Sequence, residues 1–528
     1  MNEMIKVSAE EIFAEIDQDD SFKEGLGLFE TVKRNNNFYH DKQWEGVRAP
    51  DLDKPVFNVL KPAVNYFVSM LVSDDVGVDV ELLEGVHGIE KAAVENAVRG
   101  SIDSLLENVK FNWLSREFLK NCAIDGDACF YLWWDEEADK SSEHWLKGAI
   151  QIDLVDNTDV CFGDKSTNVL ERQPFVIIRQ RKPTLLVREE ARKLGIEEWE
   201  EIRPDGYGAE RIYNDDKLEG EFTTLAVKFW KEDGKVWWTR CTRKVVLNRP
   251  VCLGIERYPI VYMSWEREKN CCHGISPLSG RINNQIFINK IYAMAMEYQK
   301  NMAFPKLLYD ATLIPKWSNK VGQAIAVNGN PQTALFATFA PNGMNEQALS
   351  LANSTISLTK DSMGVYDAAL GNVKPNNTSA IIAVQQASAQ PLELQRLDFY
   401  QAVEDLVRIA LEFMGKFYGL REVLVLDEDG NEDFAWFDFG VLAGMNVRLK
   451  VNVGRSSYWS ELVQVQTLDN MLAGGIIPDA YTYLEQIPEG YVRNKSRIMR
   501  ALKKKMKEND KETQKLLAQL ETGAEQKQ

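Results

Sequence analysis

The sequence predicts an α+β fold in which long helices separate two groups of strands. Apolar residues recur at helical spacing in residues 277–302, 345–370 and 380–418. Short runs rich in β-branched and aromatic residues, typical of strands, recur between residues 128 and 247 and return at 420–453. The chain has 528 residues, 45% of them hydrophobic, which is enough for about two to four domains with cores of their own.

The first of the three central helices is expected to begin at Ser276 and Pro277. Serine is a good N-cap, and proline fits the first helical turn because the N–H that it lacks would be unpaired there. One face of this helix is unusually rich in amides: Asn283, Asn284, Gln285, Asn289, Gln299 and Asn301. Such a face is either solvated or packed against polar copies of itself.

A compact insert is expected between this helix and the next. Prolines and glycines punctuate residues 303–344 and leave the short apolar runs KLLYD, QAIAVNG and TALFATFA. These runs predict the strands of a small β-rich insert closed by turns.

A polar loop and a third helix complete the central region. The second helix is expected to start at Asn345 and to end near Gly371, because glycine suits a helix C-cap. Residues 371–379 have the composition of a loop. The third helix, 380–418, contains Pro391, which removes a backbone hydrogen bond and should kink it.

The N-terminal part of the chain mixes helices and strands. Residues 5–37 predict one amphipathic helix with acidic solvent positions, and residues 90–124 predict a helix whose apolar stripe includes Trp113. The triplet Asp125-Gly126-Asp127 predicts a turn, and the run ACFYLWW at 128–134 predicts a buried strand.

The C-terminal part returns to strands and then to helices. Residues 420–453 predict a hairpin followed by a last strand, and residues 459–528 predict helices. The last helix, from about residue 494, is basic. A solvated helix end or a contact with DNA or a partner would each explain its lysines and arginines.

Composition excludes several classes of protein. The net charge of −17 argues against a protein that coats nucleic acid, which would be basic. The acidity lies outside the centre, because residues 270–416 hold 11 Lys and Arg against 10 Asp and Glu, which leaves 51 against 69 elsewhere. The N-terminal residues lack the apolar core of a signal peptide, and no run approaches the roughly 20 apolar residues of a membrane span.

No metal or cofactor is expected. The seven cysteines have no scaffold spacing and indicate free thiols. Cys271, Cys272 and His273 lack the CxxC knuckle of a zinc site. The acidic run 427–431 resembles a calcium loop, but its glycine is at the fourth position and no glutamate follows at the twelfth.

An enzyme is not expected either. The sequence has no GxxxxGK[ST], HExxH, GxSxG or GxGxxG motif, and none of its four histidines has the context of a catalytic triad. Acidic residues are plentiful, so a metal-dependent nuclease stays open as an alternative. A helical scaffold or adaptor is the second alternative, although it gives the insert and the loop no role.

Two stretches carry a resemblance to a known family. The first is GISPL (Gly274, Ser276, Pro277 and Leu278) followed in order by the insert, the second helix, the segment LGNVKPNNTSA and a long helix that contains QQASAQ. The second is FYHDKQW, with Phe38, Tyr39, Gln43 and Trp44. In both, and by element order over most of its length, the chain resembles the portal proteins of tailed bacteriophages.

The resemblance implies an α+β portal-type fold with an α/β wing, a helical stem, a β-rich clip, a long kinked helix and a helical crown. The implied boundaries are 1–272 and 419–455 for the wing, 273–302 and 345–370 for the stem helices, 303–344 for the clip, 371–379 for a tunnel loop, 380–418 for the long kinked helix, and 456–528 for the crown and tail.

The resemblance also implies a function and partners. The expected assembly is a homo-oligomeric ring of about twelve subunits at one capsid vertex, made in the host cytoplasm, through which double-stranded viral DNA passes during packaging and ejection. The implied partners are the terminase large subunit, then head-completion or adaptor and tail proteins, and the major capsid or scaffolding protein. No cofactor, catalytic residue or membrane is implied.

Two sets of site residues follow from this resemblance. The residues expected to face DNA, on the tunnel loop and the stem, are Asn372, Lys374, Asn376, Asn377 and Lys360. The residues expected to dock the terminase and adaptor, on the clip, are Lys316, Trp317, Lys320, Gln323, Asn328 and Asn330.

Overall fold

The computed structural model describes most of the chain. The described residues are 8–50, 52–72, 76–82, 91–136, 138, 148–205, 222–302, 306–316, 326–330, 332, 335–339, 346–365, 390–426, 432–442, 447–453, 458–475, 477, 480–487, 495, 497–499 and 501–502.

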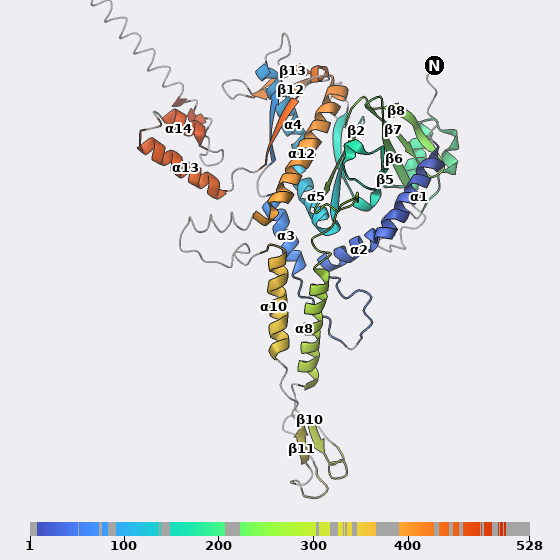
Figure 1. The fold of residues 1–528 in the computed structure, drawn as a ribbon, viewed down its shortest axis with the longest axis vertical. Coiled ribbons are helices and arrows are strands. Elements are labelled where there is room, and N and C mark those ends of the chain that lie inside the picture. Colours follow the sequence, from blue (N-terminus) through green and yellow to red (C-terminus); the bar gives the residue numbers. More distant parts are fainter. Residues whose placement is uncertain are drawn as a thin grey trace, which may run out of the picture.

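A pair of helices projects from a larger body and ends in a small sheet (Figure 1). The helices are α8 (Ile282–Met302) and α10 (Glu346–Ser362), and we call them the stalk. The sheet pairs β10 (Lys306–Tyr309) with β11 (Leu335–Phe339), as antiparallel strands. We call the described residues from 306 to 339 the tip.

Two antiparallel sheets form the centre of the body. One has the order β3-β2-β9, with β2 (Asp127–Asp135), β3 (Ala149–Val155) and β9 (Ile260–Ser264). The other has the order β4-β5-β6-β7-β8, with β4 (Val160–Phe162), β5 (Phe175–Pro183), β6 (Phe222–Glu232), β7 (Lys235–Cys241) and β8 (Val246–Cys252). Tyr131 of β2 packs against Phe229 of β6, with ring centroids 5.9 Å apart, so side chains of the two sheets meet.

Helices and two smaller sheets surround this centre. The helices are α1 (Ala9–Leu26), α2 (Leu28–Tyr39), α3 (Leu60–Leu71), α4 (Lys91–Asn108), α5 (Phe111–Asp125), α6 (Thr184–Lys193) and α12 (Glu393–Phe413). The smaller sheets pair β1 (Val76–Leu82) with β14 (Val447–Val453), and β12 (Leu420–Leu426) with β13 (Glu432–Asp438). Helices α13 (Tyr458–Ala473) and α14 (Ala480–Gln486) follow.

The body contains residues that precede the stalk in the sequence and residues that follow it. Strand β1 pairs along its whole length with β14, from Val76 opposite Val453 to Leu82 opposite Val447. Helix α12 buries Phe399, Val403 and Leu406 in the same core as Phe118 and Phe130, whose rings stack at 4.0 Å. The chain therefore leaves the body through α8 and returns to the same core through α12.

The predicted strand ACFYLWW is β2, and the predicted hairpin is β12 and β13. The runs KLLYD and TALFATFA contain β10 and β11. The hairpin tip, 427–431, and the chain around Gly371 lie outside the described residues. Pro391 lies in a 3₁₀ turn, Gln390–Leu392, that opens α12. Residues 366–389 are also outside the described part, so the start of the expected kinked helix, 380–389, is not tested.

Two of the predicted long helices are each broken in two. The predicted helix 5–37 is α1 and α2, because Gly27 adopts a left-handed backbone with φ of +67° and ends α1. The predicted helix 90–124 is α4 and α5, with Lys110 between them at φ of +53°. The side chain of Trp113, just after that break, is 56% exposed, so its assignment to the apolar stripe was wrong.

The expected solvent position of the acidic residues in α1 is also wrong for two of them. Asp19 and Asp20 are buried, as is Lys23, whose ammonium lies 2.8 Å from Asp19 and bonds two backbone carbonyls next to β4 at 2.8 and 2.7 Å. Arg179 of β5 donates from Nη1 to both Asp20 oxygens at 2.9 and 3.0 Å. Burial opposes ionisation of Asp19, but Lys23 and Lys165 outweigh it and hold its pKa at about 2. These charges fasten α1 to the five-stranded sheet.

Candidate functional site

The two stalk helices pack along one another through a small, mixed face. Ile288 of α8 and Ala352 and Thr359 of α10 are buried, in agreement with the helical period predicted for α10. Polar groups add three links: Asn284 Nδ2 to Thr359 Oγ1 at 3.1 Å, Tyr292 Oη to Asn353 Oδ1 at 3.3 Å, and Arg281 Nη2 to the Ser362 carbonyl at 3.0 Å.

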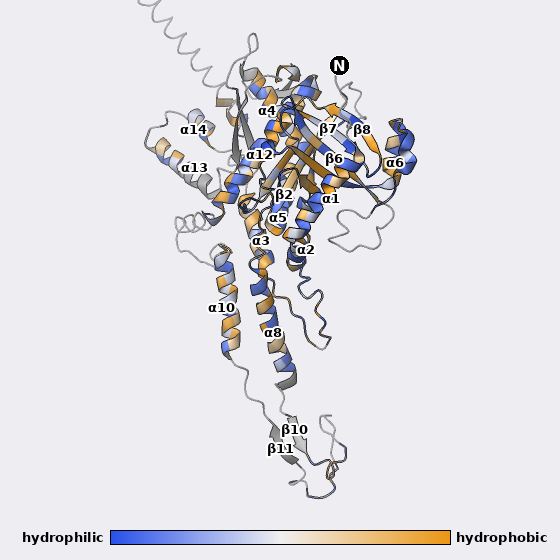
Figure 2. Cartoon of the chain, turned by 45° about the vertical axis from the view of Figure 1, so that its right-hand side comes forward, coloured by the Kyte–Doolittle hydropathy of each residue, from blue (hydrophilic) through white to orange (hydrophobic). Residues whose placement is uncertain are grey.

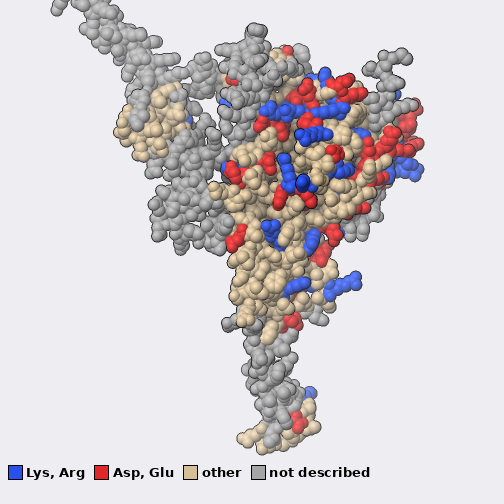
Figure 3. Space-filling view, viewed as in Figure 1, with Lys and Arg blue, Asp and Glu red and all other residues tan. Residues whose placement is uncertain are grey.

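The outer faces of the stalk expose large apolar side chains. Phe287 and Met294 of α8 are 38% and 61% exposed, and Leu351 and Leu358 of α10 are 54% and 67% exposed. The two leucines are seven residues apart, so they lie on one face of α10. Apolar and polar residues are interspersed along both helices in Figure 2. This face of the stalk carries few charged side chains, whereas many crowd the body (Figure 3).

A buried amide network attaches α8 to the segment before α3. Gln285 is fully buried, and its Nε2 donates to the Phe57 carbonyl at 2.8 Å and to Asn289 Oδ1 at 3.0 Å. Its Oε1 accepts from the backbone N–H of Val59 at 2.9 Å. Asn289 Nδ2 donates in turn to Gln43 Oε1 at 2.5 Å.

For Gln285 and Asn289 both interpretations of the amide-rich face were wrong. These amides neither face solvent nor need another copy of the chain as a partner, because residues of the same chain already make hydrogen bonds with them. Gln43, the glutamine of the FYHDKQW element, is one of their partners. The sequence signal available was the i, i+4 spacing of Gln285 and Asn289 beside the buried positions Ile282 and Ile288.

The GISPL segment joins the stalk to the body through the predicted Asp125-Gly126-Asp127 turn. Gly274 donates its backbone N–H to buried Asp127 at 2.8 Å, and Ser276 Oγ donates to the Ala123 carbonyl of α5 at 2.7 Å. A Cβ on Gly274 would lie 2.6 Å from Ser264 Cβ, and one on Gly126 would lie 2.8 Å from the Gly274 carbonyl oxygen. Glycine at 126 therefore lets this turn approach the backbone at Gly274, and glycine at 274 leaves room for the side chain of Ser264.

The expected N-cap role of Ser276 is displaced by one turn. Ser276 Oγ accepts from the Leu278 N–H at 3.1 Å, which caps a turn at 277–281, and α8 itself begins at Ile282 instead of Pro277. Beside this turn, His273 Nδ1 lies 3.1 Å from Tyr262 Oη and 3.3 Å from Asp127 Oδ2. Burial and the Asp127 charge raise the pKa of Tyr262 well above its ordinary value, so its hydroxyl keeps its proton.

The comparisons with known proteins point to one family. The family described as Phage P22-like portal protein matches residues 193–458, which is half of the chain. The chain belongs to the P22-like portal protein family. A comparison with curated proteins returned no match.

The match to the P22-like portal family spans the elements from GISPL onward that the resemblance singled out, whereas the FYHDKQW element at 38–44 lies outside it. It starts at the last residue of α6, includes the GISPL junction, both stalk helices, the tip and α12, and ends at the first residue of α13. Portal proteins are structural proteins of the phage capsid, where they form oligomeric rings, so membership gives this chain a phage portal role.

Three of the six expected docking residues of this portal protein are described by the structure, and they lie at the tip. Lys316, Asn328 and Asn330 are exposed. The two described loops of the tip meet where the Asn328 N–H donates to the Leu313 carbonyl at 2.8 Å, and Asn330 Oδ1 accepts from the Gln332 N–H at 3.0 Å. Trp317, Lys320 and Gln323 lie outside the described residues.

The expected DNA-facing residues are mostly untested. Lys360 is half-buried near the body end of α10. Asn372, Lys374, Asn376 and Asn377 lie outside the described residues, so the structure does not test whether they meet Lys360.

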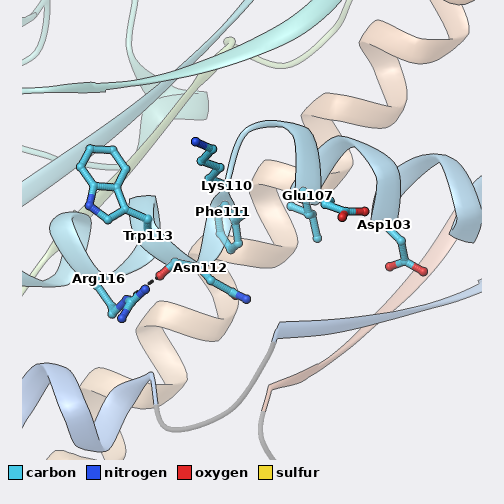
Figure 4. A pocket seen from close by; sticks show the side chains of 8 residues that line it. Asp103, Glu107, Lys110, Phe111, Asn112, Trp113 and Arg116 are labelled. Atoms are coloured by element: carbon cyan, nitrogen blue, oxygen red, sulfur yellow. Dashed lines mark hydrogen bonds between the residues drawn. The ribbon is translucent and has the colours of Figure 1, made fainter.

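A hollow beside Trp113 carries no catalytic arrangement. It lies where α4 passes into α5, and Asp103 and Glu107 line it on one side and Lys110 and Arg116 on the other (Figure 4). Arg116 is turned back onto its own helix, where Nε donates to the Asn112 carbonyl at 2.8 Å. Within the described residues, no group of three His, Cys, Asp or Glu is placed to hold a metal ion. None of the helices in this described part of the chain is long and apolar enough to cross a membrane.

Proposed function

We propose that about twelve copies of this portal protein form a ring whose stalks surround a channel for double-stranded viral DNA. Family membership supports the ring, and the exposed apolar faces of the stalk support the position of its subunit contacts.

The observation that carries the proposal is the row of uncovered leucine, methionine and phenylalanine side chains on α8 and α10. Within one subunit, Leu351 and Leu358 remain more than half exposed. Full burial of an exposed leucine contributes about 1.5–3 kcal/mol, so covering what remains exposed of each of these two contributes roughly half to two-thirds of that, and a ring would repeat the contribution at every interface. Several large apolar side chains exposed on one pair of helices favour a protein contact there.

Charge supports passage of DNA without tight binding. The net charge of −17 per chain sums to roughly −200 in a ring of about twelve, so the body repels a polyanion. Residues 270–416 are close to neutral, with 11 basic and 10 acidic residues. We propose that Lys360, together with Asn372, Lys374, Asn376 and Asn377 of the loop 371–379, makes transient contacts with phosphate. Such contacts would weaken as salt rises.

The tip is the proposed docking site. We propose that residues 303–344 bind the terminase large subunit during packaging and head-completion or adaptor and tail proteins afterwards, through Lys316, Trp317, Lys320, Gln323, Asn328 and Asn330. The body would contact the major capsid or scaffolding protein at one vertex of the virion, after assembly in the host cytoplasm. ATP hydrolysis belongs to the terminase in this scheme.

The ring is tested by the mass of the full-length protein in solution and by negative-stain images of the same sample. The expected mass is about twelve times 60.2 kDa, with a central hole. Leu358→Asp should shift the population to monomers, because each interface would then bury a carboxylate. Leu186→Asp is the matched control, since Leu186 is 57% exposed on α6, away from the stalk.

Two results would contradict the proposal. If the Leu358→Asp protein formed rings as stable as those of the wild type, this face of the stalk would not be part of the subunit contact. A wild-type protein that stays monomeric or dimeric under all assembly conditions would leave the ring unsupported and favour a scaffold or adaptor role.

A further inference from the structure

A cavity of about 410 Å³ lies between the two central sheets of the body, beside the end of α12. Small-molecule sites span about 300–1,000 Å³, so this volume is sufficient for a ligand of a few rings. Aromatic side chains from three strands and the segment after α12 line it: Tyr131, Trp133, Trp134, Phe229, Trp238 and Phe417. Walls of this kind bind flat apolar groups by stacking and edge contacts.

Contacts among the aromatic side chains and their neighbours hold the walls of the cavity in place. Trp134 stacks on Phe417 with ring centroids 5.2 Å apart, and the guanidinium of Arg421 lies 5.6 Å from the Trp134 ring. Trp133 donates from its indole nitrogen to Asp153 at 2.7 Å. The aromatic surface is therefore formed before any ligand arrives.

Positive charge predominates among the residues that line the cavity. Lys182, Arg240 and Lys416 line it, against Glu136 and Asp153. Arg240 is paired with Glu190, and Asp153 is engaged by Trp133. Among the described residues, the ammonium groups of Lys182 and Lys416 have no hydrogen-bond or ion-pair partner; Lys182 is half-buried, and Lys416 and Glu136 are exposed at the rim.

The backbone around Lys416 is unusual and positions this lysine. Helix α12 ends in a single π turn, Met414–Tyr418, which carries both Lys416 and Phe417 to the cavity. Turns of this type are rare and are frequent at functional sites. A Cβ on Gly254 would lie 3.0 Å from Lys416 Cε, so the glycine leaves the space along which the lysine chain lies.

We propose that this cavity binds a planar aromatic anion, with its ring among Trp133, Trp134 and Trp238 and its anionic group beside Lys182 and Lys416. An aryl carboxylate, sulfonate or phosphate has this chemistry. The cavity is formed within one subunit, so this proposal is independent of the ring.

The test is calorimetric titration of the full-length protein with 2-naphthalenesulfonate and with its neutral counterpart 2-naphthalenemethanol. The sulfonate should bind one saturable site per chain, at least threefold more tightly than the alcohol. Lys182→Met with Lys416→Met should weaken the sulfonate at least tenfold and leave the alcohol unchanged. Lys235→Met is the matched control, because Lys235 is an exposed lysine of β7 that does not line the cavity.

A second variant tests the location without relying on charge. Val251 lines the cavity and is 47% exposed, so Val251→Trp places an indole at its rim and should weaken both probes at least tenfold. The absence of saturable binding, equal affinity for the two probes, or a double-lysine variant that binds as tightly as Lys235→Met would overturn the proposal. Unchanged binding by Val251→Trp would do so as well.

Discussion

Gln285→Met tests whether the amide network attaches the stalk to the body. Methionine keeps the length and much of the volume of the glutamine side chain but makes none of its hydrogen bonds. The substitution leaves the Phe57 carbonyl, the Val59 N–H and Asn289 Oδ1 without the partner they have in the wild type. Each buried bond contributes about 1 kcal/mol net, so the loss should be about 3 kcal/mol.

Hydrogen exchange at the Phe57 amide measures this loss. That N–H donates to Asn289 Oδ1 at 3.3 Å, a bond that the substitution keeps, so it exchanges when the segment detaches from α8. A loss of about 3 kcal/mol predicts exchange faster by roughly 100-fold, because each 1.4 kcal/mol is a factor of ten. A local probe is preferable here, because unfolding of a chain of this size is not expected to be two-state.

Gln299→Met is the matched control on the same helix, because Gln299 is exposed. It should leave the exchange rate of the Phe57 amide unchanged. If Gln285→Met altered that rate by no more than Gln299→Met does, the network would contribute nothing to attachment, and the reasoning from buried amides would fail.

Three further outcomes follow from the structure. Asp19 has a folded pKa of about 2 against an ordinary 3.8, so its ionisation should add about 2 kcal/mol to the free energy of unfolding above pH 4, and this stability should be lost as the pH falls from about 4 to 2. Lys165→Met should move this loss to higher pH in acid-unfolding curves. An unmoved curve would refute the pairing of Lys165 with Asp19. Gly274→Ala should lower stability in thermal unfolding by about 1–3 kcal/mol, because the added Cβ would meet Ser264 Cβ at 2.6 Å. Gly280→Ala is the control and should lower stability by less than about 0.5 kcal/mol, because nothing lies within 4 Å of its Cβ. Equal losses would contradict the argument from close approach. Trp113→Ala should change the unfolding midpoint little, since its side chain is 56% exposed, and a loss as large as a core tryptophan's would show that the side chain is packed.

The elements that the sequence predicted correctly share a physical basis. In α10 the buried residues Ala352 and Thr359 recur at the period of the helix, so the buried face can be read from the chain. Strand β2 was recognisable as an uninterrupted apolar run, and its first six residues are buried. The GISPL motif and the order of elements around it also indicated the portal family, which the match to residues 193–458 confirms.

The two helix breaks were harder to predict, because the local sequence at each break carries only a weak signal for it. Gly27 interrupts a pattern that stays amphipathic on both sides, and a single glycine costs a helix only about 1 kcal/mol. Lys110 adopts a positive φ with no local signature at all. In both places the packing of two separate helices on the body outweighs the propensity of the chain to continue as one helix.

The sequence by itself determined the kinds of elements, their order and the family, because hydrophobic period and motif spacing are local properties. Tertiary structure alone decided which polar residues are buried. Whether Gln285 faces water depends on Val59, 226 residues away in the sequence, and whether Asp20 does depends on Arg179, 159 residues away. A buried polar group is stable only when its partners are present, and those partners are brought together only by the fold.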